Sequence, residues 1–410
     1  MSEVEKIYEI IDGYRDEVIE LQKALTAKVA LGPEYGGSGE HEKTEFIRGL
    51  LESIEPSGLE IVKAPDERAQ DGCRPNLIAE WEDAEGDQRV WVLSHSDIVP
   101  PGDLSLWTCD PYQVKVEGDR IIGRGVEDNQ HGFISSYLGL KAILDSGLGL
   151  GRRVGLVIVA DEETGSKCGL GYLLENHGNR FKEEDLIVVP DGGNEEGTMI
   201  EVAEKTLLWL KFTVTGKQCH ASMPNNGKNS LFGAARLIVS LADLKKRFGR
   251  TEDLFSPPES TFEPTKMEAN VPNVNTIPGK NIFFLDCRVL PQYQVDDVLS
   301  ACGEIASGIA AELDLDIAVE PVYRQEATEP TSTDAPVVKA LTKAIKGVTG
   351  KEAKPMGIGG GTVAALFRRA GLPAAVWSTG FDSAHQPNEY CLISNILTDA
   401  KVFACLYLGK

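Results

Sequence analysis

The chain is short of several features that would place it in a particular protein class. It has six histidines and eight cysteines in 410 residues, and no two cysteines form a CxxC pair. Scattered cysteines are typical of reduced thiols, so the sequence argues against a disulfide framework and against a zinc site built on thiolates. There is no apolar run near the roughly 20 residues of a membrane span, and the N-terminal stretch is charged and amphipathic rather than a signal peptide. We therefore expect a cytoplasmic protein.

Basic residues are also scarce. The chain has 41 Lys and Arg against 63 Asp and Glu, a formal net charge of −22. Such an acidic surface argues against nucleic acid or an anionic membrane as a partner. Hydrophobic residues make up 42% and charged residues 25%, which is ordinary for a globular protein. The length fits two or three domains.

Helix and strand signals alternate in the N-terminal half. Apolar residues recur at helical spacing in 4–28, 42–54 and 132–146. The strand signals are short apolar stretches around 59–63, 76–81, 90–94, 153–160 and 186–190. This order predicts an α/β fold with a doubly wound, mostly parallel sheet and helices on both faces. In such folds, ligands bind at the carboxyl ends of the strands.

The pattern changes near residue 206. A half-exposed strand, a helix over 230–247, a Pro- and Ser-rich loop over 253–266, a second strand, a helix over 295–312 and a third strand follow in order. This order predicts an inserted α+β sandwich with one open sheet face. The doubly wound pattern then resumes with a helix at 336–348, a glycine-rich loop, a short strand and a final helix. We expect one discontinuous domain over 1–204 and 326–410, and an inserted domain over 205–325.

The stretch VWVLSHSDIVP ends an apolar run with His95 and Asp97. Residues i and i+2 of a strand point to the same face, so the two side chains would lie side by side where the strand ends. A carboxylate beside an imidazole can fix its tautomer for metal binding or catalysis. Taken alone, the pair favours a capped core histidine.

Four more polar clusters stand where strands are expected to end. They contain Asp128 in GRGVEDNQHG, Asp161 to Glu163 in DEETGS, Asp191 in PDGG and His385 in AHQPNE. Each alone could be solvated surface. Together, two imidazoles and at least three carboxylates suit Zn²⁺, and Mn²⁺ or Co²⁺ less well. One bridging carboxylate would suit two metals about 3.5–4 Å apart. Without metal, so many carboxylates would repel each other and raise their pKa values.

With these motifs the chain resembles the co-catalytic zinc peptidases and deacylases, which include succinyl-diaminopimelate desuccinylase, acetylornithine deacetylase, aminoacylase, glutamate carboxypeptidase and peptidase T. The resemblance runs from about Ile10 to Leu408. It is carried, in order, by HSDIVP, WTCDPY, GRGVEDNQHG, DEETGS, PDGG, GKQCHASMP, NTIP with DCR, GGGT and AHQPNE.

The resemblance implies a role for each residue of the metal site. Asp128 would bridge the two metals, followed by a cis peptide to Asn129, and Glu162 would be the general base. Asp97 would orient a ligand histidine from behind. The remaining ligands would be His95 and Asp191 for the first metal, and Glu163 and His385 for the second.

The inserted domain would be the lid and dimerisation domain of this family, which implies a homodimer. His220 would reach across from the lid, often from a partner subunit, to stabilise the oxyanion. Asn275 and Arg288 match residues that hold the substrate carboxylate, although Arg288 could equally pair with nearby Asp286.

Gly359, Gly360, Gly361 and Thr362 match the glycine loop beside the active site of the family. Its amides could bind a carboxylate, or it could be a plain tight turn.

The sequence departs from the family pattern in two places. Many relatives have an acid where this chain has Val363, which removes the substrate contact expected from that acid. Asp191 stands where desuccinylases of the family often have glutamate, and an aspartate there resembles the dipeptidase and aminopeptidase branch. His41, His131 and His177 match nothing catalytic, and we expect them at the surface.

These observations predict a two-metal amidohydrolase of small N-acyl amino acids or short peptides. A non-catalytic, metal-binding scaffold is the alternative from another class, but an intact Glu162 argues against it. A third possibility is hydrolysis of a ureido or amidino C–N bond, which would release ammonia rather than a primary amine.

Overall fold

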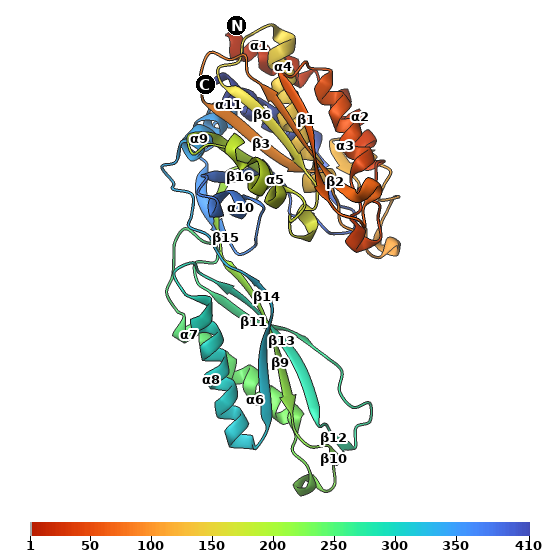
Figure 1. Cartoon of the computed structure of the whole chain (residues 1–410), viewed down its shortest axis with the longest axis vertical. Helices are drawn as coiled ribbons and strands as arrows, with labels where there is room; N and C mark the ends of the chain where they lie inside the picture. Colours follow the sequence, from red (N-terminus) through yellow and green to blue (C-terminus); the bar gives the residue numbers. More distant parts are fainter. Residues whose placement is uncertain (1) are drawn as a thin grey trace. The chain divides into compact units, whose positions relative to one another are not determined.

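The computed structural model describes residues 2–410 and divides the chain into two compact units (Figure 1). The first unit comprises residues up to Val202, Thr331–Pro355 and Val363–Lys410. The second comprises Ala203–Pro330 and Met356–Thr362. The chain thus leaves the first unit and returns to it, so the second is an insertion in sequence.

The first unit is built on an eight-stranded sheet. Its strands, in spatial order, are β1 (Gly58–Pro65), β2 (Cys73–Trp81), β6 (Arg153–Val159), β3 (Arg89–His95), β7 (Leu186–Asn194), β16 (Ala374–Thr379), β8 (Met199–Glu204) and β15 (Lys354–Ile358). The four central strands, β6, β3, β7 and β16, run parallel, whereas β1, β2 and β8 pair antiparallel to their neighbours. The predicted α/β fold with a parallel sheet at its centre is confirmed.

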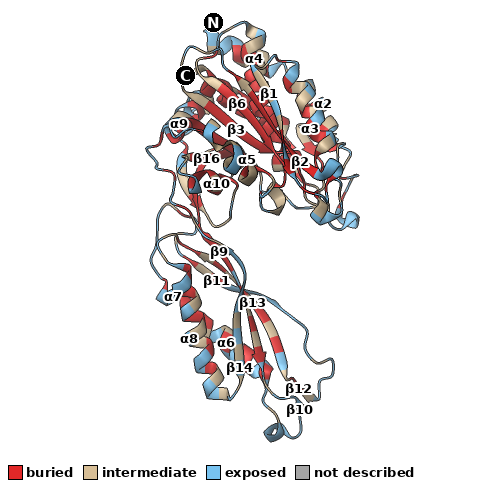
Figure 2. Cartoon of the chain, in the orientation of Figure 1, coloured by how far each residue is buried: buried red, intermediate tan, exposed pale blue. Residues whose placement is uncertain are grey.

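Helices lie on both faces of this sheet, which explains why the central strands are buried almost throughout (Figure 2). The helix α4 (His131–Ser146) contacts β3 and β7 and packs against α11 (Ile393–Leu408), which also contacts α1 (Glu3–Asp12), α2 (Arg15–Thr26) and α9 (Pro336–Thr349). On the other face, α5 (Leu170–His177) and α10 (Ala364–Arg369) share a core with Trp91 and Leu93. The remaining long helix, α3 (His41–Glu52), contacts β2.

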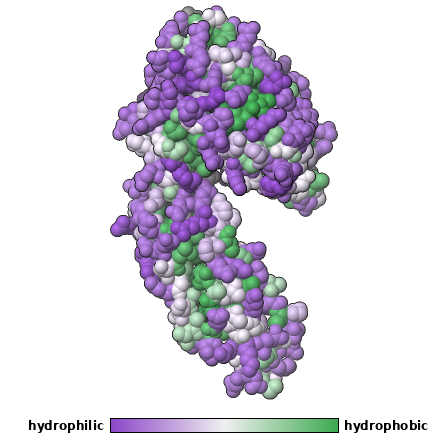
Figure 3. Space-filling model, viewed as in Figure 1, coloured by the Kyte–Doolittle hydropathy of each residue, from purple (hydrophilic) through white to green (hydrophobic). Residues whose placement is uncertain are grey.

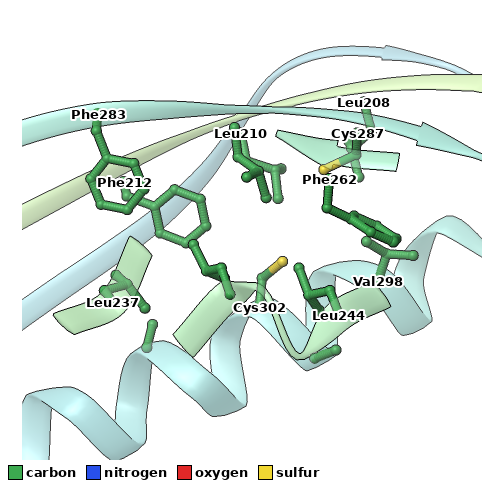
Figure 4. Close-up of a cluster of buried hydrophobic side chains, with 14 of the residues drawn as sticks. Leu208, Leu210, Phe212, Leu237, Leu244, Phe262, Phe283, Cys287, Val298 and Cys302 are labelled. Carbon is green, nitrogen blue, oxygen red and sulfur yellow. The ribbon is translucent and has the colours of Figure 1, made fainter. Parts of the chain in front are cut away.

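The second unit is a four-stranded antiparallel sheet with helices against one face. The strand order is β11 (Thr261–Met267), β13 (Lys280–Val289), β9 (Thr206–Thr215) and β14 (Asp316–Gln325). Side chains of β13 alternate strictly between buried and partly exposed. The buried ones meet α6 (Ser230–Leu241), α7 (Leu244–Arg247) and α8 (Val295–Leu313), with Phe212 stacked on Phe283 at 4.8 Å (Figure 4).

Short elements complete the chain. A two-stranded ribbon joins β10 (Cys219–His220) to β12 (Thr276–Ile277), and a small sheet joins β4 (Lys115–Glu117), β5 (Arg120–Ile122) and β17 (Tyr390–Leu392). Two expectations about elements are wrong. The stretch 4–28 is two helices, because the first ends at Gly13, and β11 lies where a loop was expected.

The glycine loop groups with the second unit. Lys205 N donates to Ile358 O at 3.0 Å, and Arg288 Nη1 donates to Gly359 O at 2.8 Å. Thr362 Oγ1 donates to Glu204 Oε1 at 2.6 Å. Within residues 2–410, no helix is long and apolar enough to cross a membrane. Hydrophilic residues cover most of the face of the first unit seen in Figure 3, and hydrophobic patches are visible on both units.

Candidate metal centre

The polar clusters singled out in the sequence come together at one edge of the large sheet. His95 is the last residue of β3, and Asp191 lies in the C-terminal half of β7. Glu162 and Glu163 form the short helix η5 (Glu162–Thr164) two residues after β6, and His385 follows β16. Because β3, β6, β7 and β16 are parallel, their carboxyl ends meet at the same edge. Asp128 lies in η4 (Val126–Gln130), which leads into α4.

Asp128 lies between the two histidines. Its Oδ1 is 2.8 Å from His95 Nε2 and its Oδ2 is 3.1 Å from His385 Nε2. His385 Nε2 also lies 3.0 Å from Glu163 Oε2, and His95 Nε2 lies 3.7 Å from Asp191 Oδ1. A carboxylate with one oxygen towards each imidazole has the geometry expected of a bridging ligand.

Two overlapping sets of side chains could each hold a cation. His95, Glu162 and Asp191 present ligand atoms within 4.8 Å of one another, and so do His95, Asp128 and Glu163. His385 joins the second set through its bonds to Asp128 and Glu163. Imidazole nitrogens and carboxylate oxygens in this number fit divalent ions such as Zn²⁺, Mn²⁺ or Co²⁺. The residues present therefore fit two cations.

Asp97 fixes the positions of three of these side chains. Its Oδ1 accepts from Glu162 N at 3.1 Å and its Oδ2 accepts from Glu163 N at 3.0 Å. His95 Nδ1 lies 3.0 Å from Asp97 O and 3.5 Å from Asp97 Oδ1. An Nδ1–H donor leaves Nε2 unprotonated to bind a cation, which is the orientation that a metal-ligating histidine needs.

The local backbone explains two motifs. The peptide Asp128–Asn129 is cis, as the family resemblance predicts, and Asn129 Oδ1 accepts from His95 N at 3.1 Å. In PDGG, a Cβ on Gly193 would lie 1.8 Å from Ser378 O, so only glycine lets β7 pair with β16 beside Asp191.

Burial and mutual repulsion shift the carboxyl pKa values of the centre. Burial, and then the charge of Asp191, raises the pKa of Glu162 well above its usual range. Burial and Asp128 raise the pKa of Glu163 to about 7, and burial also raises the pKa of Asp191. Carboxyl pKa values raised in this way indicate a site short of positive charge, which divalent cations would supply.

The pKa values of the two histidines are also raised, which favours the charged form of each imidazole. Hydrogen bonds to Asp128 and Glu163 raise the pKa of His385 to about 10. Burial opposes protonation of His95, but the charges of Asp191 and Asp128 outweigh it and raise the pKa well above the usual range. Those same imidazoles outweigh burial at Asp128 and lower its pKa. The imidazolium groups thus balance part of the negative charge.

In the second unit, two predicted substrate-side residues lie together. His220 on β10 pairs with Thr276 on β12, and Ala221 N donates to Asn275 O at 2.9 Å. Ser222 N donates to His220 Nδ1 at 3.2 Å. An Nδ1 that accepts places the proton on Nε2, so neutral His220 presents an N–H donor.

Arg288 forms the ion pair with Asp286 and also contacts the glycine loop. Its Nε and Nη2 donate to the two oxygens of Asp286 at 2.7 and 3.0 Å, so the ion pair is formed. Its Nη1 donates to Gly359 O in the glycine loop. The loop residues Gly360, Gly361 and Thr362 therefore lie beside Arg288, which is at the opposite end of β13 from the ribbon that carries His220.

Other histidines and Val363 differ in their surroundings. The expectation of a surface position is wrong for His131, which is buried because the first turn of α4 packs against the sheet and its Nδ1 contacts Glu127 O. His41 and His177 are partly exposed. Val363 is buried in a core with Ala364 and Phe367, so its side chain has no contact to offer a substrate.

Sequence reasoning missed several residues around the centre. Tyr35 is 40% exposed, and burial together with the charges of Glu163 and Asp97 raises its pKa. The buried carboxylates of Glu127 and Glu389 bind backbone next to the ligands. The two glutamates could have been found from the sequence, because each lies inside a motif that carries a proposed ligand: Glu127 in GRGVEDNQHG and Glu389 in AHQPNE. Tyr35 lies in no such motif.

Comparison with known proteins decides the family. The model of Peptidase family M20/M25/M40 matches residues 91–408. The chain belongs to this peptidase family. It is 40% identical over 406 residues to an uncharacterized metallohydrolase from Methanococcus maripaludis, covering 95% of this chain and 98% of that protein. It is 26% identical over 375 residues to succinyl-diaminopimelate desuccinylase from a Nitratiruptor strain, covering 91% and 94% of the two chains.

Solved structures agree on the fold. The chain aligns with aminopeptidase PepT from Bacillus cereus at a TM-score of 0.74 and 18% identity, covering 97% of this chain and 99% of that one. As a member of the M20 family, the protein is a metallohydrolase that acts on peptide or other amide bonds.

Proposed function

We propose that the protein hydrolyses the amide bond of a small N-acyl amino acid or a short peptide, with two divalent cations and Glu162 as general base. The observation that carries this proposal is the convergence of two imidazoles and four carboxylates at one sheet edge, with Asp128 between both histidines. The first unit is then the catalytic domain and the second the lid.

Bound divalent cations would lower the pKa of a water and polarise the substrate carbonyl. Glu162 takes a proton from the attacking water and returns it to the leaving amine. Its raised pKa suits both steps, since a base that is too acidic holds the proton too weakly to deliver it. The bond from Glu162 N to Asp97 Oδ1 holds the base in place. His95, Asp128, Asp191, Glu163 and His385 would hold the cations.

His220 would donate its Nε2–H to the oxyanion that forms when water attacks the carbonyl. Arg288 and the glycine loop would hold the substrate carboxylate, with Arg288 fixing the loop through Gly359 O and the amides of Gly360 and Gly361 facing the anion. Asn275 would add a polar contact from the ribbon beside His220.

The distance between these groups supports a homodimer. His220 lies beyond the Lys280 end of β13 and Arg288 near its other end, so about 26 Å of strand separates them at ~3.3 Å per residue. One small substrate cannot span that distance within one lid. If both residues contact the same substrate, His220 must come from a partner subunit. The exposed apolar side chains Leu231, Phe232 and Val239 of α6 offer a surface for that partner.

Zinc is the proposed metal, because mixed imidazole and carboxylate ligands suit it best, with Co²⁺ or Mn²⁺ as substitutes. All eight cysteines of the chain are free. Together with the scattered cysteine pattern, this supports the proposal of a reducing compartment such as the cytoplasm.

Substrate profiling tests the proposed function. The purified protein is incubated with N-acetyl and N-succinyl amino acids and with dipeptides, with and without a chelator, and both primary amine and ammonia are measured. We expect chelator-sensitive release of amine from one substrate class. Release of ammonia from ureido or amidino compounds would favour that C–N chemistry instead. No release under any added metal would favour a non-catalytic scaffold.

A further inference from the structure

Two buried glutamates beside the centre take no part in the mechanism above. Glu127 is 6% exposed and Glu389 is fully buried. Each belongs to a segment that carries a proposed ligand: Glu127 precedes Asp128, and Glu389 follows His385. We name these the Asp128 segment (residues 124–130) and the His385 segment (residues 380–389).

The carboxylate of Glu127 does not bind its own segment. Its Oε2 accepts from Ser383 N at 2.8 Å and from Ser383 Oγ, and its Oε1 accepts from Phe381 N. These donors lie on the turn that leads directly into His385. Glu127 therefore holds the backbone of the His385 segment from a position next to Asp128.

Glu389 makes the reciprocal contacts. Its Oε1 accepts from Glu127 N at 2.9 Å and from Asp128 N at 3.1 Å. Its Oε2 accepts from Gly125 N at 3.0 Å and from Arg124 Nη1 at 2.5 Å. The segment that carries His385 thus fixes the backbone of Asp128 itself.

We propose that Glu127 and Glu389 form a reciprocal clamp that positions the two ligand segments for cation binding, Glu127 aligning His385 and Glu389 aligning Asp128. The clamp rests on the proposed metal centre. It does not touch a cation or the substrate, so both glutamates are positioning residues. Mutation of a residue that hydrogen-bonds to a metal ligand and orients it commonly lowers metal affinity by about 10- to 100-fold.

The chemistry of the contacts explains why both residues are acidic. A carboxylate accepts with both oxygens, and both oxygens of each glutamate face N–H or O–H donors. Glutamine has nearly the same shape, but its NH₂ group would meet a donor on one side. A Glu→Gln change therefore removes bonds and adds repulsion without altering volume.

The two halves of the clamp have different expected effects. His385 pairs with Asp128 and Glu163, which are ligands proposed for the second cation, so misplacing it should weaken one cation site. Asp128 has one oxygen towards each histidine, so misplacing it should weaken both sites. A purely structural role for the glutamates would lower stability without this asymmetry.

A calorimetric titration of chelator-treated protein with Zn²⁺ tests the clamp. Glu127→Gln should bind one Zn²⁺ with wild-type affinity and the second at least about 10-fold more weakly, and Glu389→Gln should bind both at least about 10-fold more weakly. Asp185→Asn is the matched control. Asp185 is buried, and its Oδ2 accepts from Trp91 Nε1 and Lys182 N at 3.0 Å each. It directly precedes β7, so it lies at the opposite end of that strand from the metal centre. It should lower thermal stability and leave both affinities unchanged.

Ser383→Ala provides a milder test if Glu389→Gln does not fold. It removes one donor to Glu127 and should weaken only the second Zn²⁺ by several-fold. Wild-type Zn²⁺ affinities in Glu127→Gln would overturn the clamp while leaving the metal centre intact. If Glu389→Gln does not fold, wild-type affinities in Ser383→Ala would do the same. A wild-type protein that binds fewer than two Zn²⁺ would overturn the metal centre, and the clamp with it.

Discussion

Four carboxylates and two imidazoles share one small volume at the centre, and each group changes the protonation of its neighbours. Hydrogen bonds to Asp128 and Glu163 raise the pKa of His385, while burial and the charge of Asp128 raise the pKa of Glu163. This balance of charges follows from the ligand set alone. It explains why positions that look like ordinary solvated acids in the sequence behave differently once folded.

Glu162→Gln should keep the cations and lose turnover. The proposed base touches the attacking water, and general-base catalysis contributes about 10²- to 10⁴-fold, so kcat should fall by that factor. Elemental analysis should still find wild-type metal content. Turnover within a few-fold of wild type would remove Glu162 from the role of base.

Cation affinity should rise with pH. A cation needs His385 without its proton, and the pKa of that imidazole is about 10 without metal; Glu163, with a pKa of about 7, must also be ionised. Because ligands lose protons on binding, affinity should increase from about pH 6 towards pH 10, with about tenfold per pH unit wherever one proton is released. Calorimetry at pH 7 in two buffers of different ionisation enthalpy measures the protons released. Zero release at pH 7 would contradict the assignment of His385 as a ligand.

Elements bring these residues together through contacts that a single stretch of sequence does not reveal. Arg74 on β2 is fully buried, with its Nε 2.8 Å from Glu40 Oε2 and its Nη1 3.4 Å from Glu34 and 3.6 Å from Asp161. It thereby links the loop that carries Tyr35 to the turn that carries Glu162.

Arg74→Met should be strongly destabilising. It would leave Glu40 buried without its cation, and breaking a buried pair in this way costs about 3–5 kcal/mol. Arg68→Met is the control, since Arg68 is exposed and solvent screens its pairs with Asp66 and Glu34, so its effect on stability should be much smaller. Chemical denaturation measures both. Equal effects of the two variants would contradict the assignment of Arg74 as the buried link.

The elements that were predictable from sequence are those with strong periodicity. The parallel strands are buried on both faces, so RVWVLSH and RVGLVIV are almost continuously apolar. The strand β11 was missed because it lies at the edge of its sheet. An edge strand can include a proline and exposed charged residues, here Pro264, Glu263 and Lys266, so its sequence looks like a loop. The site residues were predictable because each lies near the end of a strand or in the segment after it. The clamp was not, since Glu127 and Glu389 meet their partners across 254 to 265 residues.

Each of the two units is a sheet with helices packed against it, on both faces in the first unit and on one face in the second. The proposed dimer requires His220 of one subunit to act in the centre of the other. Mixing two inactive variants, His220→Ala and Glu162→Gln, tests this directly.

Neither variant should be active alone, but a heterodimer contains one site with both intact residues. Random exchange makes about half the dimers heterodimers with one working site of two, so activity should recover to about one quarter of wild type. Subunit exchange is verified with differently tagged chains. Heterodimers without recovered activity would contradict the contribution of His220 in trans.

The central claim is that two cations at the Asp128 centre make this chain an amide hydrolase. The most direct measurement is amine release from the preferred substrate as Zn²⁺ is added back to chelator-treated protein in steps. We predict binding of about two Zn²⁺ per chain, with activity that reaches its plateau only when the second site is filled. Activity that survives complete removal of metal, or a plateau without any bound cation at the centre, would contradict the account.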